Sequence, residues 1–473
     1  MQEPLSQNER NDIEELLRQY QNIKKGRSHV FLEEEAFSDI IDYYDDHDNL
    51  CEALTAANTG LEYFPFSSHL LIKKADLLIA FAQYERALDF LDQAALLNGN
   101  DINIYILKTD AFLALDQQEM AVVLLEEAIS KFEGEEKLEL LFELADVYED
   151  YESFDKVFEC LQLILTEDPN NEEALYKICF WTDCTGRYEE SISLHKKITD
   201  DFPYNELAWF NLGAAFQGLK LFEKAIDAYK FALVIDEKFD YAYRNMGDAF
   251  IRLRKYKDAI ETLEKVLELT RPEEVIYEAI GHCYHRIGKF PMARFNYRKA
   301  SHLNPEASRL QYKIGLTYIN EKQWLQALKP LENAISIKKN VPEFHLAIGE
   351  CYLQLQRYRE SIQHLGIVVR SKPHNIKGWE TLIRCLFRAG YYEEAGHQCQ
   401  MALKATNNKP IFMYMYAAVL FAEGNQKSGL VYLLEALDAA PKLVKKMVAL
   451  NPSILQNSQV IDVLSRFKTR KKL

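Results

Sequence analysis

Apolar side chains recur along this chain with the spacing of amphipathic helices. In the stretch that begins at Glu206, one stripe of apolar and small residues falls at positions 4, 7, 8 and 11, and a second falls at positions 20, 24 and 27. Intervals of three and four residues place each stripe on one face of a helix. The pattern therefore predicts two helices within one unit, joined by a turn near position 15.

This pattern repeats along the chain at a fixed step, with clear units starting at 206, 240 and 274. In the unit that starts at 206, the recurring slots 4, 7, 8, 11, 17, 20, 24 and 27 hold Trp209, Leu212, Gly213, Phe216, Phe222, Ala225, Tyr229 and Ala232. Weaker copies continue in both directions, with a two-residue insertion at Glu136 and Lys137. Twelve units are predicted, at 34–67, 68–101, 102–135, 138–171, 172–205, 206–239, 240–273, 274–307, 308–341, 342–375, 376–409 and 410–443.

The residue types in these slots suit stacked helix pairs. Glycine or alanine at positions 8 and 20 lets the two helices approach closely, while aromatic residues at 4, 11, 17 and 24 fill the space between neighbouring pairs. Proline near position 32, as at Pro305 and Pro373, ends the second helix. One pair cannot bury its own stripe, so the pattern predicts an all-α solenoid stabilised by stacking.

The register resembles the tetratricopeptide repeat (TPR) family, in the long arrays of the bacterial type, over about 410 of the 473 residues. The resemblance implies a right-handed superhelix of about twelve helix-turn-helix repeats. Such arrays need helical caps, because an uncovered terminal face would expose an apolar patch. We expect an N-terminal cap within 1–33 and C-terminal caps with a basic tail within 444–473. Their apolar stripes are Ile13, Leu16, Leu17, Tyr20 and Ile23, ending at Gly26, then Leu443–Leu450, and finally Val460, Ile461, Val463, Leu464 and Phe467.

Charge adds an asymmetry to this regular picture. The formal charge of the chain is -16, made up of -28 in residues 1–200 and +12 in residues 201–473. Opposite charges at the two ends predict either steering of a charged partner or head-to-tail self-association between the acidic and basic halves. A merely solvated acidic surface is an equal alternative.

Three features of the sequence bear on the compartment. The N-terminus lacks a basic stretch followed by an apolar one, and no window approaches the roughly 18 apolar residues of a membrane span. The eight cysteines lack paired spacing, which suits reduced thiols better than a disulfide framework. We expect a cytoplasmic protein without a membrane span.

Motifs for catalysis are missing from the sequence. It contains no phosphate-binding loop, dinucleotide-binding glycine pattern, zinc-protease motif or nucleophile elbow, so we expect no enzyme and no cofactor. His282, Cys283 and His285 come closest to a metal site, but two histidines on one face do not fix a zinc ion. Cys283, Cys351 and Cys385 all occupy position 10, where the family usually has alanine, and small buried residues explain them as well.

The resemblance also indicates where a partner would bind. In proteins of this family the first helices line a concave groove, into which positions 2, 5, 6, 9, 12 and 13 look. A polar strip with mixed charge and aromatic residues suits an extended or helical peptide. Solvated helix faces with local ion pairs are the alternative. The candidate peptide-binding residues are Asn211, Gln217, Tyr241, Arg244, Asn245, Asp248, Arg252, Glu278, His282, His285, Arg286, Arg309, Tyr312, Lys313 and Asn320.

Two narrower partner classes can be weighed against this groove. Asn211 and Asn245 match one asparagine of the carboxylate clamp in chaperone-binding members, but the neighbouring units lack the remaining residues, so chaperone-tail binding is not predicted. RNA or another nucleic acid is the alternative partner, because the second half is net positive. Its basic residues include Arg252, Arg254, Lys255 and Lys257 and the tail Arg466, Lys468, Arg470, Lys471 and Lys472. An isoelectric point near 5.3, and lysines that fall on inter-helix turns, favour a non-catalytic scaffold or adaptor for proteins.

Overall fold

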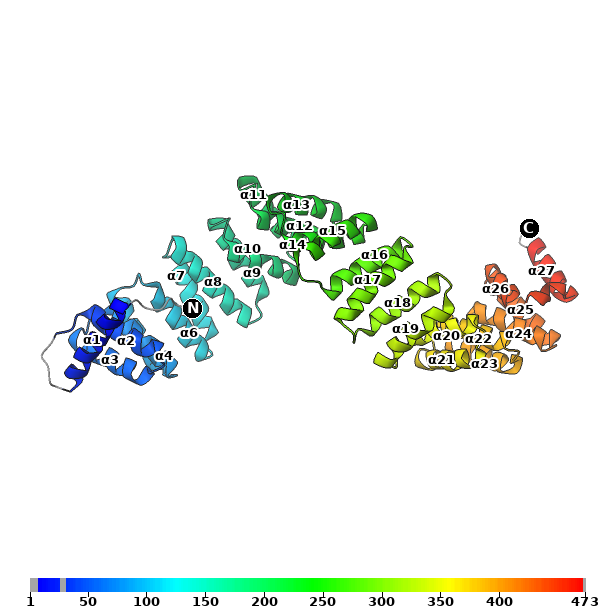
Figure 1. The fold of residues 1–473 in the computed structure, drawn as a ribbon, viewed down its shortest axis with the longest axis horizontal. Coiled ribbons are helices and arrows are strands. Elements are labelled where there is room, and N and C mark those ends of the chain that lie inside the picture. The colour runs from blue at the N-terminus through cyan, green and yellow to red at the C-terminus, as the bar shows by residue number, and fades with distance from the viewer. Residues whose placement is uncertain (1–6, 26–30, 471–473) are drawn as a thin grey trace. The chain divides into compact units, whose positions relative to one another are not determined.

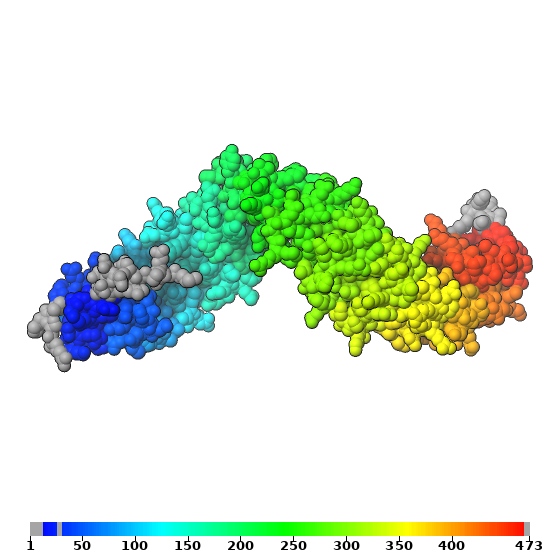
Figure 2. Space-filling model, in the orientation of Figure 1, coloured from blue at the N-terminus to red at the C-terminus, as the bar shows by residue number. Residues whose placement is uncertain are grey.

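The computed structural model describes residues 7–25 and 31–470, and every regular element in these ranges is a helix (Figure 1). This confirms the all-α class for the described residues. The chain divides into two compact units, Met1–Glu237 and Lys238–Leu473. Figure 2 shows the surface of the first unit in blue to green and that of the second unit in green to red.

The first unit contains a single helix followed by six helix pairs. The bounds are α1 (Gln7–Lys24), α2 (Glu34–Asp46) with α3 (Leu50–Tyr63), α4 (Ser68–Ala80) with α5 (Tyr84–Leu97), α6 (Ile102–Ala114) with α7 (Gln118–Ile129), α8 (Gly134–Asp150) with α9 (Phe154–Glu167), α10 (Glu172–Thr185) with α11 (Tyr188–Asp201), and α12 (Glu206–Gly218) with α13 (Phe222–Ile235).

The second unit contains six further pairs and a C-terminal group of helices. The pairs are α14 (Asp240–Arg252) with α15 (Tyr256–Leu269), α16 (Glu274–Arg286) with α17 (Phe290–Leu303), α18 (Ser308–Asn320) with α19 (Trp324–Ile337), α20 (Pro342–Gln354) with α21 (Tyr358–Ser371), α22 (Ile376–Arg388) with α23 (Tyr392–Ala405), and α24 (Pro410–Ala422) with α25 (Gln426–Ala439). The final group is η1 (Pro441–Leu443), α26 (Val444–Leu450), η2 (Pro452–Gln456) and α27 (Ser458–Arg470).

Within a pair, the glycine at position 8 lies against the large residue at position 24. A Cβ atom on Gly213 would lie 2.5 Å from the ring of Tyr229, which is fully buried. The same close approach joins Gly281 to Tyr297, where the distance would be 2.7 Å. These contacts confirm that the small residue allows the two helices to pack closely.

The turn between the helices of a pair uses one left-handed residue at position 15. Ala82 has a φ of 55° and Arg254 a φ of 59°, and the equivalent position in each of the twelve pairs also has a positive φ. Four of these positions are occupied by glycine, while the others carry a side chain. The predicted turn near position 15 is therefore confirmed, and it costs backbone strain wherever glycine is absent.

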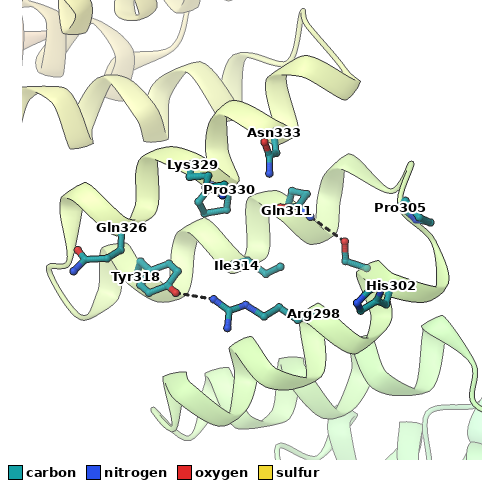
Figure 3. Close-up of a pocket in the computed structure, with 11 residues that line it drawn as sticks. Arg298, His302, Pro305, Gln311, Ile314, Tyr318, Gln326, Lys329, Pro330 and Asn333 are labelled. Atoms are coloured by element: carbon teal, nitrogen blue, oxygen red, sulfur yellow. Dashed lines mark hydrogen bonds between the residues drawn. The ribbon is translucent and has the colours of Figure 1, made fainter.

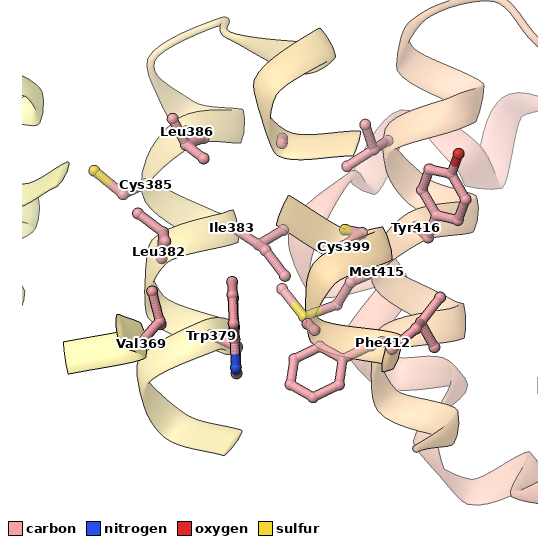
Figure 4. Close-up of a cluster of buried hydrophobic side chains, with 14 of the residues drawn as sticks. Val369, Trp379, Leu382, Ile383, Cys385, Leu386, Cys399, Phe412, Met415 and Tyr416 are labelled. Carbon is pink, nitrogen blue, oxygen red and sulfur yellow. The ribbon is translucent and has the colours of Figure 1, made fainter. Parts of the chain in front are cut away.

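Adjacent pairs share their apolar cores. Between α22, α23 and α24, the buried side chains of Trp379, Ile383, Cys399, Phe412 and Met415 pack into one cluster (Figure 4). In this part of the second unit, each pair thus buries its stripes against the next pair, as expected for an array stabilised by nearest neighbours.

Helix α1 packs against α2 of the first helix pair. Tyr20 of α1 is fully buried and packs edge-on against Phe37 of α2, with ring centroids 6.5 Å apart. Leu16, Leu17 and Ile23 pack around the same cluster. The expected end of this stripe at Gly26 lies outside the described residues.

The C-terminal helices α26 and α27 pack on α24 and α25, and one residue of the expected stripe does not take part. Val460 of α27 is fully buried, and Val463, Leu464 and Phe467 pack against the same cluster. Ile461 is 50% exposed, so its place in the stripe was wrong. Of the expected basic tail, Lys471 and Lys472 lie outside the described residues.

One helix is longer than the repeat pattern predicts. Glu136 and Lys137, the two inserted residues, lie in the first turn of α8, which begins at Gly134. The insertion therefore extends a helix at its N-terminal end. Gly134 has a φ of 64°, a conformation that glycine adopts easily, which explains how the chain turns before the extended helix.

Candidate functional site

The candidate residues lie on the first helices of four pairs. Asn211 and Gln217 are on α12 of the first unit, and the remaining thirteen are on α14, α16 and α18 of the second. We call the surface formed by the first helices of a unit its first-helix face.

The two candidates of the first unit hold helices together. Asn211 is only 3% exposed, so it does not face an open groove. Its amide donates a hydrogen bond of 2.7 Å to the Leu175 carbonyl and lies 3.2 Å from Nε2 of His195. Gln217 accepts a hydrogen bond of 3.1 Å from the Tyr229 hydroxyl. Both amides therefore stabilise the packing around α12.

His195 is the buried partner of this network. Burial lowers its pKa to about 4, although the Ser191 carbonyl, 2.8 Å from Nδ1, favours the protonated ring. A neutral ring can donate from Nδ1 and accept from Asn211 at Nε2, which matches both contacts.

Arg244 joins α14 to the start of α16. Its guanidinium lies 2.7 Å from Glu273 and 2.9 Å from Asp240, and it donates to the Thr270 hydroxyl at 3.3 Å. These contacts, with Glu273 contributing most, raise the pKa of Arg244. The arginine is consequently committed to intramolecular bonds.

Glu278 forms the centre of a second ion-pair group. Lys313 lies 2.6 Å and Arg309 3.0 Å from its carboxylate, and Arg309 also pairs with Glu274. Burial opposes ionisation of Glu278, but Lys313 and Arg309 outweigh it and lower its pKa. The group links α16 to α18 and neutralises most of the local charge.

The histidines of α16 are held by neighbouring side chains. His285 lies 2.9 Å from the Asn320 amide, and His282 packs edge-on against Tyr256, whose hydroxyl accepts a 3.1 Å hydrogen bond from Arg286. Burial, followed by nearby positive charges, lowers the pKa of both histidines. They are therefore neutral near pH 7.

The metal alternative gains no support from the geometry. Cys283 is fully buried, and burial raises the pKa of its thiol to about 12. Across residues 7–25 and 31–470 there is no group of three histidine, cysteine, aspartate or glutamate side chains that could hold a metal ion. Cys351 and Cys385 are also fully buried, as small core residues would be.

The remaining candidates present the accessible part of the strip. Tyr241 is 61% exposed, and the side chain of Arg252 is 62% exposed although it pairs with Asp248 at 3.4 Å. Asn245, on the same helix, is partly exposed. Tyr312 lies against the Phe344 ring with centroids 4.9 Å apart. Arg286, Arg309 and Asn320 are exposed as well, so the accessible part of the strip extends over α14, α16 and α18.

Sequence reasoning missed several features of the surface. Val275, at position 2 of α16, is 64% exposed, and its place beside Tyr241 in the register was a usable signal. A cavity of about 580 Å³ lies between α17, α18 and α19, away from the predicted groove (Figure 3). There Arg298 donates to the Tyr318 hydroxyl at 2.8 Å, and Pro330 lies inside α19.

The sequence predicts the C-terminal helix α26, within Leu443–Leu450, but not the surface on which this helix lies. It packs against α24, burying Met447 completely, and Lys446 forms a 2.5 Å ion pair with Glu380 of α22. The following Asn451 donates to the Ala418 carbonyl of α24 at 3.2 Å. Glu380 and Ala418 occupy positions 5 and 9 of their repeats, so α26 lies on the first-helix face of the second unit.

No described helix is long and apolar enough to cross a membrane.

Comparison with known proteins gives matches in both units. Two tetratricopeptide repeat models match residues 207–239 and 242–275, and a model of the anaphase-promoting complex, cyclosome, subunit 3 matches residues 288–368. BBSome complex member BBS4 of Bos taurus is 28% identical over 154 residues, which is 33% of this chain and 29% of the bovine protein. The match therefore spans less than a third of that protein.

Solved structures with similar folds have low overall superposition scores. The APC/C hetero-tetramer Cut9–Hcn1 covers 82% of this chain and 97% of its own at 12% identity, with a TM-score of 0.35. The C-terminal part of a TPR repeat-containing protein from Cytophaga hutchinsonii covers 54% and 98% at 17% identity, with a TM-score of 0.44. The family assignment rests instead on the matched repeat models and on the regular helix pairs. These pairs begin at the same position of successive 34-residue repeats, at Glu206, Asp240 and Glu274. The chain is a tetratricopeptide-repeat protein.

Proposed function

We propose that this chain is a non-catalytic scaffold or adaptor that binds segments of partner proteins on its first-helix faces. The observation that carries the proposal is α26, a helix of the chain itself that lies on the first-helix face of α22 and α24. Its apolar Met447 is buried while its Lys446 meets a carboxylate, which is how a helical segment of another protein would be held.

In the central strip, we assign partner contact to the exposed residues Tyr241, Val275 and Arg252. The Arg244–Glu273 ion pair brings the starts of α14 and α16 together, and these ends carry Tyr241 and Val275. Arg309 contributes an exposed edge to the same face. The ion pairs of Glu278 with Arg309 and Lys313 hold α16 against α18 on the same face.

The experiment compares two matched triple variants of the full chain. Tyr241→Ala, Arg252→Ala and Val275→Ser remove the exposed strip, while Phe295→Ala, Lys257→Ala and Met292→Ser remove similar groups from α15 and α17. We expect the wild type and the second variant to capture the same proteins from the native cell extract, and the first variant to lose them. Equal capture by all three chains, at unchanged helicity, would refute the assignment.

Nucleic acid is the second candidate, favoured by the formal charge of +15 in residues 238–473. Part of this charge lies on turns, as at Arg254, and Arg466 of the tail pairs with Asp462 at 2.8 Å. Nuclease treatment of a parallel capture separates the two classes. Capture that survives nuclease and falls only modestly with salt supports protein partners, whereas a steep decline with salt supports nucleic acid.

Two further proposals concern assembly and compartment. Residues 1–237 carry a formal charge of -31 and residues 238–473 carry +15, which favours salt-sensitive association between copies. Light scattering that reports a monomer at every salt concentration would refute this. All eight cysteines are free thiols, which suits a reducing compartment such as the cytoplasm.

A further inference from the structure

The first-helix face of the first unit carries exposed aromatic side chains beside a hollow. Tyr176 and Phe180, at positions 5 and 9 of α10, are each 61% exposed. An open hollow of about 380 Å³ lies between α8 and α10, with Phe142 and Lys177, the residue after Tyr176, in its lining. The rest of this lining is mostly acidic: Glu135, Glu139, Glu143, Asp146 and Glu173, with Lys177 as the one cation.

Lys177 shows how this hollow holds a positive charge. Its ammonium group lies 2.9 Å from Glu173 and 3.5 Å from Asp146, and 5.2 Å from the centre of the Phe142 ring. Two carboxylates and an aromatic face are the groups that recognise lysine or arginine. The hollow therefore has the chemistry of a lysine-binding pocket.

Carboxylates continue along this face at equivalent positions. Asp42, Asp76, Asp110 and Asp146 occupy position 9 of four successive repeats, one on each first helix from α2 to α8. Lys73 pairs with Asp42 at 2.5 Å. In the described part of the chain, no cation lies within ion-pair distance of Asp76, Asp110 or Glu143.

The unpaired carboxylates repel one another. Partial desolvation raises the pKa of Asp76, Asp110 and Glu143, although the side chains of Asp76 and Asp110 are exposed, and neighbouring carboxylates raise it further for Asp76 and Glu143. Lys73 alone acts in the opposite direction on Asp76. A cation supplied from outside would relieve this repulsion.

The second unit contains a model for the occupant. Helix α26 has the sequence VKKMVAL, in which lysines alternate with apolar residues. On the first-helix face there, its lysine meets Glu380 and its methionine is buried. The first unit offers the same combination of carboxylates and apolar surface without a helix of this kind on it among the described residues.

We propose that the first-helix face of α4, α6, α8 and α10 docks a basic segment of a partner protein, in which lysine or arginine alternates with apolar side chains. The basic side chains pair with Asp76, Asp110 and Glu143, and the apolar ones pack on Tyr176 and Phe180. This deepens the proposed scaffold function, on which it rests, by assigning a partner class to a second surface. Nucleic acids and anionic lipids do not fit, because residues 1–237 carry a formal charge of -31.

The test uses the full chain and a fluorescein-labelled peptide of about 14 residues, with lysines and leucines at helical spacing. One triple variant carries Asp76→Asn, Asp110→Asn and Glu143→Gln, which removes repulsion without breaking an ion pair. A control with the same net charge carries Asp89→Asn, Glu119→Gln and Glu127→Gln on α5 and α7. A double variant carries Tyr176→Ala and Phe180→Ala.

We expect fluorescence anisotropy to show that the first triple variant raises the Kd about tenfold, as for the loss of three exposed ion pairs, and that the control changes it by about twofold or less. The double variant should also raise the Kd about tenfold, and replacing the leucines of the peptide with glycine should weaken binding to the wild type. Equal weakening by both triple variants would mean diffuse attraction and would overturn the proposal.

Two other outcomes would also overturn it. One is undiminished binding of a peptide whose lysines are replaced by glutamate. The other is an oligomer of the wild type that the first triple variant dissociates in sedimentation velocity, which would make a second copy the occupant. Because these variants leave α14 and α16 unchanged, failure here is distinguishable from failure of the capture experiment at Tyr241, Arg252 and Val275.

Discussion

Replacing Gly213 with alanine tests whether close approach of the paired helices stabilises the array. The added Cβ would lie 2.5 Å from the Tyr229 ring, which is fully buried and bonded to Gln217. Overpacking of this kind costs up to about 3 kcal/mol. Alanine returns about 1 kcal/mol of helix propensity, so the expected net loss is about 2 kcal/mol.

Gly366 provides the matched control, because it also lies within a helix but has open space around it. The nearest atom to a Cβ there is 3.9 Å away, at the flexible end of Arg370. Gly366→Ala should therefore stabilise α21 by about 1 kcal/mol.

Hydrogen–deuterium exchange measures these effects locally, which suits an array that opens in parts. Exchange of the protected amides in α12 and α13 should accelerate about thirtyfold in Gly213→Ala, and that of α21 should slow about fivefold in Gly366→Ala. Changes of the same sign in the two variants would refute the packing argument.

Three further predictions follow from single features of the structure. Ala82→Gly should stabilise the first unit by about 0.5–1 kcal/mol in thermal unfolding, because it removes left-handed strain at a φ of 55°. Because the pKa of His195 is lowered to about 4 in the folded chain, protection of the amides in α10–α12 from hydrogen exchange should fall with acid. The stability that the neutral ring contributes is complete above about pH 6.5 and is lost as the pH falls towards 4, at up to about 1.4 kcal/mol per pH unit. His195→Gln should flatten this pH dependence of hydrogen exchange. A thiol reagent should modify the exposed Cys51 and Cys184 quickly in the native chain, and the buried thiols only after unfolding; these are Cys160, Cys283, Cys351, Cys385 and Cys399.

Much of the fold could be predicted because each repeat carries the same physical constraints. Gly213 and Tyr229 occupy complementary slots, and this pairing is local enough to be visible in the sequence. The extension of α8 could not be predicted in the same way. An insertion of two residues fits a loop or a helix equally well. Only the structure shows that the chain turns at Gly134, through its positive φ, and that the inserted residues join the helix.

The candidate site was predicted less well, because the family's groove positions do not determine what a side chain contacts. Asn211 occupies position 6 but is buried against Leu175 and His195. Arg244 occupies position 5 but pairs with Asp240 on its own helix and with Glu273 from the segment before α16. Such contacts depend on which residues the adjacent pair presents, and a single repeat does not contain that information.

The two first-helix faces differ in whether their charges can be satisfied from within. In the second unit, Glu278 is matched by Arg309 and Lys313 from the adjacent helix, so the strip needs no external charge. In the first unit, Asp76 and Asp110 occupy the same position of successive repeats, which places like charges on successive helices. Stacking the repeats therefore brings these carboxylates close together, and the described first helices on either side place no cation within ion-pair distance of them. A basic partner consequently lowers the free energy of this face more than that of the mixed strip.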